Sequence, residues 1–325
     1  MPSPRPSVIV TRRLPRLVEE RLTELFHVTL RDDDMPMSTS DLVDAMRDAD
    51  GLLATVTDRI DAKILGTAPR RVGIVANFGV GYDHVDLAAA RTAGIVVTNT
   101  PGVLTDDTAD LAIALILSVA RRLGEGERHV RAGGWSGWRP THMMGTRVTG
   151  KTLGIVGMGR IGRAVAARAH LGFGMRVLYH QPRPLDESQL TGFDASRCAT
   201  LDELLSASDF VSLHCPATPA TRHLIDAARL RRMRPQAFLI NTARGDVVDG
   251  SALAHALRTG TIAGAALDVY EAEPSVPPEF CEMENVVLLP HLGSATVETR
   301  LAMGHRAVDN LEAYFAGREP PDRLV

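Results

Sequence analysis

The most informative stretch of the sequence is Gly157-Met158-Gly159-Arg160-Ile161-Gly162, because of the segments on either side of it. Before it, residues 152–156 (TLGIV) are typical of a short buried strand. After it, residues 163–171 (RAVAARAHL) are typical of an alanine-rich helix. A strand, a glycine turn and a helix in this order form the fingerprint of a dinucleotide-binding turn.

Each glycine of this turn has a separate expected role. Gly157 allows the tight turn, Gly159 lets the backbone approach a pyrophosphate, and Gly162 lets the helix pack on the strand. The helix N-terminus adds unpaired N–H groups and the positive end of the helix dipole. We therefore predict that residues 157–162, with Met158, Arg160 and Ile161 between the glycines, bind the cofactor phosphates.

Composition and charge exclude several classes of protein. The chain has 325 residues, enough for about two domains, and is 45% hydrophobic and 23% charged, as in ordinary globular proteins. A net charge of -3 provides no basic surface for nucleic acid. Cys198, Cys215 and Cys281 are odd in number and lack the CxxC spacing, so we expect neither disulfides nor a metal site.

No segment is predicted to cross or enter a membrane. The longest apolar run, 111–120, has about half the roughly 20 residues that a bilayer requires. The apolar stretch near the start is too short for a secretory signal and fits a first strand better. We expect a cytoplasmic protein without a membrane partner.

Strands and helices alternate along the chain, which is typical of parallel sheets covered by helices. The expected strands of the first part are 7–11, 51–54, 72–76 and 95–98, and its expected helices are 15–25, 40–49 and 61–65. A long apolar helix (105–122) and a loop or arm (124–140) should follow. The expected strands of the second part are 154–156, 176–179, 210–213, 237–241, 265–269 and 286–289.

This order predicts an α/β protein with two Rossmann-like, doubly wound parallel-sheet domains and a cleft between them. The fingerprint opens a cofactor-binding domain, which we place at 101–293. The tail, 294–325, is too small to fold alone. We expect it to return to residues 1–100 and complete a flavodoxin-like, substrate-binding domain, with the active site at the carboxyl ends of the strands.

Polar residues follow three predicted strands of the second part. Arg244 comes after FLIN, Glu273 lies just beyond AGAALDV, and His291 comes after VVLLP. Hydride transfer to a 2-oxo acid needs a proton donor, a cation for the carboxylate and carbonyl, and an anion that keeps the donor charged. These three residues supply those groups, although each type taken singly is more often structural.

The chain resembles the D-isomer-specific 2-hydroxyacid dehydrogenases, and among them the glyoxylate/hydroxypyruvate reductases. The resemblance runs nearly end to end. It is carried by the fingerprint and by VTRRLP (10–15), NFGVGYDHVD (77–86), NTPGVLT (99–105), NTARGDVVD (241–249), LDVYEAEP (267–274) and PHLGSAT (290–296).

The resemblance implies reduction of glyoxylate or hydroxypyruvate to the D-2-hydroxy acid with NAD(P)H. Arg244 then matches the catalytic arginine, Glu273 the glutamate that pairs with the histidine, and His291 the acid/base. The remaining substrate contacts are predicted at Val80 and Gly81, through their N–H groups, and at Ser294. The family is dimeric, with an arm that crosses to the partner subunit, so we expect a homodimer. Trp135 and Trp138 occupy that arm here, and packing within one subunit is their alternative role.

The second strand of the cofactor domain bears on the choice of nicotinamide cofactor. NAD sites carry an Asp or Glu at its end, whereas this chain has Tyr179-His180-Gln181-Pro182-Arg183. Arg183 could attract a 2′-phosphate, so we favour NADP(H) over NAD(H), and Pro182 leaves the strength of this preference open. The other predicted cofactor contacts are His180, Gln181, Cys215, Pro216, Thr242, Ala243, Asp268 and Gly293.

Two alternatives remain open at this point. A D-lactate or other D-2-hydroxyacid dehydrogenase is one alternative, because side-chain packing sets the size of the substrate pocket, although TRRLP (11–15) and NFGVGYDHVD (77–86) favour the smaller substrates. A non-enzymatic, dinucleotide-sensing protein related to corepressors could use the same scaffold, although the intact Arg244, Glu273 and His291 argue against it. Neither the physiological substrate nor the direction of flux follows from the residues.

Overall fold

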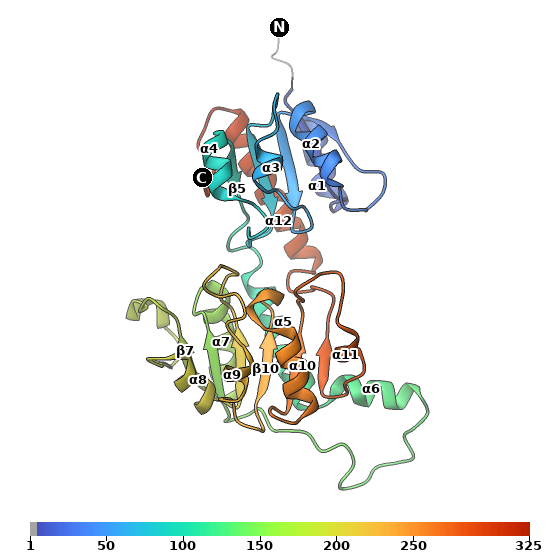
Figure 1. The fold of residues 1–325 in the computed structure, drawn as a ribbon, viewed down its shortest axis with the longest axis vertical. Helices are drawn as coiled ribbons and strands as arrows, with labels where there is room; N and C mark the ends of the chain where they lie inside the picture. The colour runs from blue at the N-terminus through green and yellow to red at the C-terminus, as the bar shows by residue number, and fades with distance from the viewer. Residues whose placement is uncertain (1–4) are drawn as a thin grey trace. The chain divides into compact units, whose positions relative to one another are not determined.

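A computed structural model describes residues 5–325, except for the side chains of Glu187 and Gln189. The described chain divides into two compact units (Figure 1). Unit 1 runs to Leu104 and also contains Ala295–Val325, and unit 2 is Thr105–Ser294. Each unit is built on a parallel sheet, which confirms the predicted fold class.

The sheet of unit 1 has five strands in the order β2-β1-β3-β4-β5. Their bounds are β1 Ser7–Val10, β2 His27–Thr29, β3 Gly51–Thr55, β4 Ile74–Phe78 and β5 Val96–Thr98. Every residue of β3 and β4 is buried, as expected for inner strands of a parallel sheet with both faces covered. The helices are α1 Arg16–Leu25, α2 Thr39–Asp48, α3 Ala62–Leu65, α4 Leu87–Ala93 and α12 Val297–Phe315.

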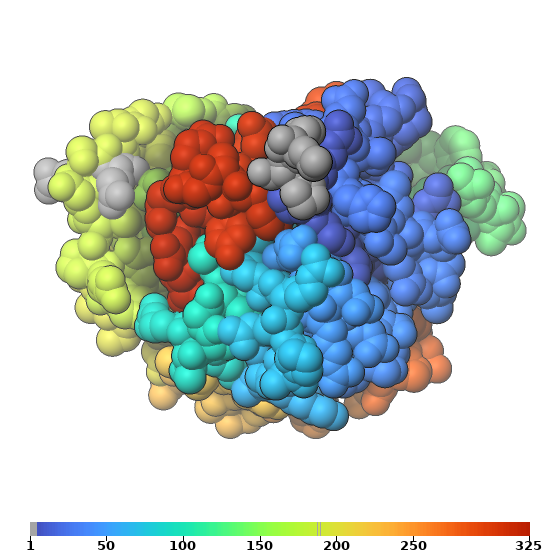
Figure 2. All heavy atoms as spheres, turned by 90° about the horizontal axis from the view of Figure 1, so that it is seen from above, coloured from blue at the N-terminus to red at the C-terminus, as the bar shows by residue number. Residues whose placement is uncertain are grey.

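The C-terminal segment packs into unit 1. Gly304 of α12 lies against Val18 of α1, so closely that an added Cβ would be 2.4 Å from a Val18 methyl group. Beyond α12, the N–H of Leu324 donates to the carbonyl of Val97 at 2.8 Å. In Figure 2 the atoms of this segment (red) lie directly beside atoms of the N-terminal part of the chain (blue to cyan). The last thirty-one residues, Ala295–Val325, are therefore part of the same core as the first hundred.

The sheet of unit 2 has seven strands in the order β12-β11-β10-β9-β6-β7-β8. Their bounds are β6 Thr152–Val156, β7 Arg176–His180, β8 Ala195–Arg197, β9 Phe210–Leu213, β10 Phe238–Asn241, β11 Gly264–Leu267 and β12 Val286–Leu288. The helices are α5 Thr105–Ala120, α6 Leu123–Arg131, α7 Arg160–Phe173, α8 Leu201–Ala207, α9 Ala227–Leu230, α10 Gly250–Arg258 and α11 Pro278–Cys281, with short 3-10 turns at Glu187–Leu190 and Gly245–Val247.

Two hydrophobic cores lie on the two faces of this sheet. Along β9, Phe210 belongs to the core that contains α5 and α7, whereas Val211 belongs to the core that contains α8 and α10. The alternation follows from the two-residue period of a strand, and it explains why the strands of this unit are apolar throughout. Among the described residues, no helix is both long and apolar enough to cross a bilayer.

Three local expectations were wrong. The stretch expected as a loop from residue 124 begins with helix α6, which an ion pair between Arg122 and Glu125 supports at its start. Two three-residue strands, β2 and β8, lie at sheet edges and carry exposed side chains, so they lack an apolar run. Strand β4 covers Ile74–Phe78 rather than 72–76, because Val72 precedes the paired segment although it is buried.

Candidate active site

The carboxyl ends of β10, β11 and β12 meet at one edge of the unit 2 sheet, because these strands are neighbours and parallel. The loops that follow them carry Arg244, Glu273 and His291. The N–H of Asp268 donates to Asn241 O at 3.0 Å, and the N–H of His291 donates to Asp268 O at 2.9 Å. The backbone thus links the three strand ends in sequence.

His291 and Glu273 form a hydrogen-bonded ion pair. Nδ1 of His291 lies 2.8 Å from Oε2 of Glu273, and the side chains are 29% and 32% exposed. Burial acts to raise the pKa of Glu273, but the hydrogen bond and the charge of His291 outweigh it and lower that pKa below its ordinary value. An ionised carboxylate accepts only, so the Nδ1 proton of His291 is donated to Glu273 and Nε2 is left for another partner.

The backbone of His291 adopts an unusual conformation. Its φ of 57° lies in the left-handed region, which a non-glycine residue enters at a cost of about 1–3 kcal/mol. Asp268 stabilises this turn, because its carboxylate accepts from the N–H of Leu292 at 2.6 Å and of Gly293 at 2.8 Å. Burial raises the pKa of Asp268. Asp268 and Gly293, both predicted as cofactor contacts, thus lie directly beside the His291–Glu273 pair.

Arg244 lies in a turn that Asn241 holds from inside the sheet. The side chain of Asn241, which is buried, donates to Arg244 O at 2.9 Å and accepts from the N–H of Ala243 at 3.0 Å. The positive charge of Arg244 is one of the influences that lower the pKa of Glu273. Arg244, Glu273 and His291 therefore lie together at one edge of the sheet, as the strand-end pattern predicts.

The glycine turn lies between β6 and α7, and its geometry fits a dinucleotide. Gly157 has φ 93°, and an added Cβ at Gly162 would be 2.3 Å from Gly157 O, so both glycines are required by the turn itself. At Gly159 an added Cβ would meet nothing within 4 Å, so packing does not explain this glycine, whereas a bound pyrophosphate does. No side chain caps the N-terminus of α7, which leaves its N–H groups for phosphates.

The end of β7 lies beside this turn. Gln181 accepts from the N–H of Met158 at 3.1 Å, and His180 O accepts from the N–H of Gly157 at 3.0 Å. Arg183 follows and is exposed. Sequence reasoning missed Arg197, which donates to Gln181 O at 3.3 Å. Arg197 is the last residue of β8, and only the pairing of β8 with β7 brings it to this site.

The remaining predicted contacts of unit 2 are distributed around the same edge. The backbone of Cys215 lies against Gly157, since its N would be 2.7 Å from a Cβ added there, and Pro216 is the next residue. The buried Oγ1 of Thr242 has no hydrogen-bond partner among residues 5–325, as expected for an atom that a ligand satisfies. Met158 is fully buried, so only its backbone can contact a cofactor.

Three predicted substrate contacts remain. Val80 and Gly81 belong to unit 1, where they form the turn after β4. Ser294 is the last residue of unit 2 and follows the His291 turn. Neither these residues nor the others described form a cluster of three or more His, Cys, Asp or Glu suited to a metal.

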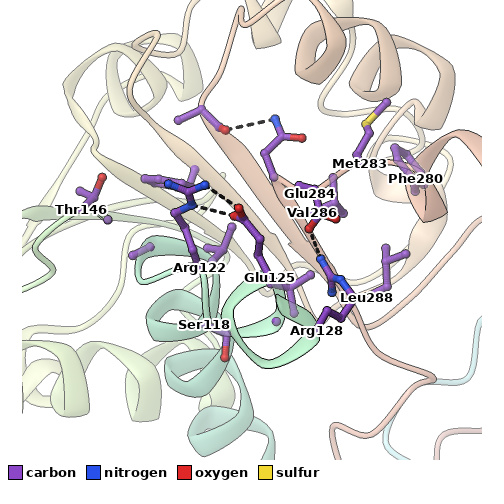
Figure 3. A pocket seen from close by; sticks show the side chains of 18 of the residues that line it. Ser118, Arg122, Glu125, Arg128, Thr146, Phe280, Met283, Glu284, Val286 and Leu288 are labelled. Carbon is purple, nitrogen blue, oxygen red and sulfur yellow. Dashed lines mark hydrogen bonds and ion pairs between the residues drawn. The ribbon is translucent and has the colours of Figure 1, made fainter. Parts of the chain in front are cut away.

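A separate cavity of about 620 Å³ lies in unit 2, and its lining includes none of the predicted site residues (Figure 3). It is bounded by the end of α5, by α6 and by β12. Ion pairs of Arg122 with Glu125 and of Arg128 with Glu284 lie beside its apolar floor. The segment after α6 leaves Trp135 57% and Trp138 81% exposed.

Comparison with known proteins gives a consistent result. Residues 113–293 match the family model of the D-isomer specific 2-hydroxyacid dehydrogenase, NAD binding domain. A glyoxylate reductase of Korarchaeum cryptofilum is 48% identical over 322 residues, which cover 98% of this chain and 95% of the relative. Another from Thermococcus onnurineus is 46% identical over 323 residues, with coverage of 98% and 95%.

A solved structure agrees over the same length. The NADPH-dependent glyoxylate/hydroxypyruvate reductase of Sinorhizobium meliloti, in complex with NADP and malonate, is 39% identical, with a TM-score of 0.85 and coverage of 99% of this chain and 97% of that one. The strand-end site, the glycine turn and these similarities lead to one conclusion. The chain belongs to the D-isomer specific 2-hydroxyacid dehydrogenase family.

Proposed function

We propose that the protein reduces a small 2-oxo acid, glyoxylate or hydroxypyruvate, to the D-2-hydroxy acid with hydride from NAD(P)H. The observation that carries this proposal is the His291–Glu273 pair, at 2.8 Å, on the same sheet edge as Arg244. The names of the similar proteins, glyoxylate reductases and a glyoxylate/hydroxypyruvate reductase, support the choice of substrate.

His291 is the proposed proton donor. Its Nε2 is directed away from Glu273, since Nδ1 takes that hydrogen bond, and it donates a proton to the oxygen of the 2-oxo group. Glu273 stays ionised and stabilises the imidazolium before the proton leaves. When bound, the reduced nicotinamide supplies the hydride.

Arg244 and the N–H groups of Val80 and Gly81 are the proposed substrate-binding groups, together with Ser294. A guanidinium offers paired donors to a carboxylate or a polarised carbonyl, and it favours negative charge as it develops on the oxygen. Backbone N–H groups bind a carboxylate without adding a charge that would have to be buried.

NADP(H) is the proposed cofactor, in preference to NAD(H). Gly157–Gly162 and the start of α7 would hold the pyrophosphate, and the free Oγ1 of Thr242 and the carboxyl of Asp268 suit the nicotinamide end. Arg183 lies in the loop after β7, where its backbone carbonyl accepts from the Gln181 side chain, and the guanidinium of Arg197 on β8 donates to Gln181 O. Both are exposed and suit a 2′-phosphate, and no carboxylate occupies the end of β7 to repel it.

A kinetic comparison tests the substrate and the cofactor together. We would measure kcat/KM for glyoxylate, hydroxypyruvate and pyruvate, each with NADPH and with NADH. The proposal expects glyoxylate and hydroxypyruvate to exceed pyruvate, and NADPH to exceed NADH. Faster turnover of pyruvate would instead indicate a D-lactate dehydrogenase, and tight cofactor binding without any turnover would indicate a sensor protein.

We also propose that the protein acts as a homodimer, with the cavity beside α6 covered by a second copy. Exposed apolar side chains gather on α6 and the segment after it, among them Leu123, Val130, Trp135, Trp138 and Met144. Large apolar surfaces of this kind usually mark an interface with another protein.

A further inference from the structure

The turn Gly79-Val80-Gly81 follows β4, an inner strand of the unit 1 sheet. All three of its carbonyl groups accept hydrogen bonds from outside the turn. The side chain of Asn77 donates to Gly79 O at 3.0 Å and to Gly81 O at 2.8 Å, and the side chain of Asn99 donates to Val80 O at 2.8 Å. The carbonyl side of this turn is therefore fully occupied by protein donors.

The N–H groups of the turn, unlike its carbonyl groups, are not all paired with protein atoms of residues 5–325. Within residues 5–325, no protein group accepts a hydrogen bond from the N–H of Val80 or of Gly81. Both residues are half-buried rather than exposed. Two adjacent backbone donors without a protein acceptor, at the carboxyl edge of a parallel sheet, form a site for a small anion.

Because the peptide unit is planar, a hydrogen bond that holds a carbonyl group also fixes the direction of the N–H group in the same peptide. In a trans peptide, the carbonyl oxygen of one residue and the N–H of the next point in opposite directions. Asn77 fixes Gly79 O together with the N–H of Thr100, which donates to the same oxygen at 3.0 Å, and these two bonds set the direction of the Val80 N–H. Asn99 fixes Val80 O and thereby the direction of the Gly81 N–H. Each proposed donor to the anion is thus oriented by an asparagine on the opposite side of the same peptide plane.

The orientation of the Asn77 amide is determined by its partners. Two carbonyl oxygens lie against one of its terminal atoms, and only an NH₂ group can donate to both. The amide oxygen must then face Nε2 of His84, at 3.0 Å, which places a proton on that nitrogen. Asn77 is 1% exposed and Asn99 is 6% exposed, so water does not compete with these bonds.

We infer that Asn77 and Asn99 are positioning residues, which orient the Val80 and Gly81 N–H groups toward the carboxylate of the substrate. They do not touch the substrate themselves. The inference rests on the proposed function in one respect, namely that this turn binds the carboxylate of a 2-oxo acid. It goes further by naming two side chains that affect the affinity for that carboxylate indirectly, through their hydrogen bonds to the carbonyl groups of the turn.

The steady-state test uses Asn77→Ala and Asn99→Ala in the full chain. A contact to the carboxylate is made both before and during the reaction, so its loss raises KM more than it lowers kcat. We expect KM for glyoxylate to rise about tenfold or more in each variant, with kcat within about threefold. The dissociation constant of NADPH should not change, because the predicted cofactor residues lie in unit 2.

A matched control separates positioning from loss of stability. Val18→Ala removes two methyl groups from a fully buried side chain in the same unit and leaves the turn intact. It should lower the stability of unit 1 without changing KM for glyoxylate. A KM that rises equally in Val18→Ala and in the asparagine variants would overturn the inference.

A binding measurement tests the role of Asn77 and Asn99 independently of turnover. Calorimetric titration of oxamate, an unreactive 2-oxo acid analogue, into protein saturated with NADPH gives the affinity from the curve shape and the folded fraction from the stoichiometry. We expect about tenfold weaker oxamate binding in both asparagine variants. Equal affinity in the variants and the wild type, or no binding by the wild type, would overturn the inference. Absence of turnover alone would contradict only the proposed function.

Discussion

His291 combines three features that a structural histidine does not need. It has a left-handed backbone, its Nδ1 is held by Glu273 at 2.8 Å, and its Nε2 is left for another partner. We expect His291→Ala to lower kcat at least about a hundredfold, because general acid catalysis typically contributes that much. The dissociation constant of NADPH, measured by fluorescence titration, should stay close to that of the wild type. Near-normal turnover by this variant would remove His291 from the mechanism.

Glu273 contributes to the free energy of unfolding in a pH-dependent way, and the direction of its pKa shift determines whether that contribution rises or falls with pH. Its pKa in the folded protein is lowered, so between that value and the ordinary value of 4.5 the unfolded chain binds more protons than the folded one. The contribution is therefore present above about pH 4.5 and is lost as the pH falls through the lowered pKa.

The variant Glu273→Gln tests this sign. Urea unfolding of the wild type and of Glu273→Gln at pH 6, 5, 4 and 3.5 should give a difference in unfolding free energy that shrinks as the pH falls. The reason is that protonation of the wild type removes the same charge that the substitution removes. A difference that grows toward low pH would contradict the assigned direction of the shift.

Substitution of Arg183 and of Arg197 tests the proposed preference for NADPH over NADH. If both contact the 2′-phosphate, Arg183→Ala and Arg197→Ala should each raise KM for NADPH about tenfold, since a hydrogen bond to a charged group contributes about 1.5–3 kcal/mol. KM for NADH should not change. Arg176→Ala is a suitable control, because Arg176 is exposed at the start of β7, whereas Arg183 follows the end of that strand and Arg197 ends the neighbouring strand β8. Equal effects on both cofactors would exclude a 2′-phosphate contact.

At the scale of the element, the glycine turn permits a paired test. Gly159→Ala adds a methyl group that meets no protein atom within 4 Å, whereas Gly162→Ala places one 2.3 Å from Gly157 O. We expect Gly159→Ala to keep wild-type stability and lose about tenfold or more in cofactor affinity. Gly162→Ala should lose affinity and also about 1–3 kcal/mol of stability, as overpacking does. Thermal unfolding and NADPH titration of both variants test this.

The elements that could be predicted are those with a strong apolar pattern. Strand β9 has the predicted bounds, Phe210–Leu213, because each of its residues is buried on one face or the other. Edge strands β2 and β8 have no such pattern, and their pairing depends on neighbours distant in sequence. Helix α6 buries no side chain, and it contains Gly124 and Gly126, so its helical form rests on ion pairs that periodicity does not reveal.

Across the two units, the placement of the proposed acid/base pair could be predicted from the sequence, whereas the side chains around the site that hold backbone groups could not. Parallel topology brings successive strand ends to one edge, so Arg244, Glu273 and His291 could be expected together. The roles of Asn77, Asn99 and Arg197 depend on hydrogen bonds to specific backbone carbonyls. Those bonds are set by turn conformation and strand pairing, for which the sequence has no periodic signal.

The oligomeric state provides the last prediction. If a second copy covers the cavity beside α6, replacing Trp135 and Trp138 by Ser should weaken the dimer, because these side chains are 57% and 81% exposed in one chain. Sedimentation velocity over a range of concentrations should show a dimer for the wild type and a shift toward monomer for the double variant. Leu171→Ser is the matched control, since Leu171 is 69% exposed in the same unit but on α7. A monomeric wild type, or an equal shift in the control, would contradict the proposed interface.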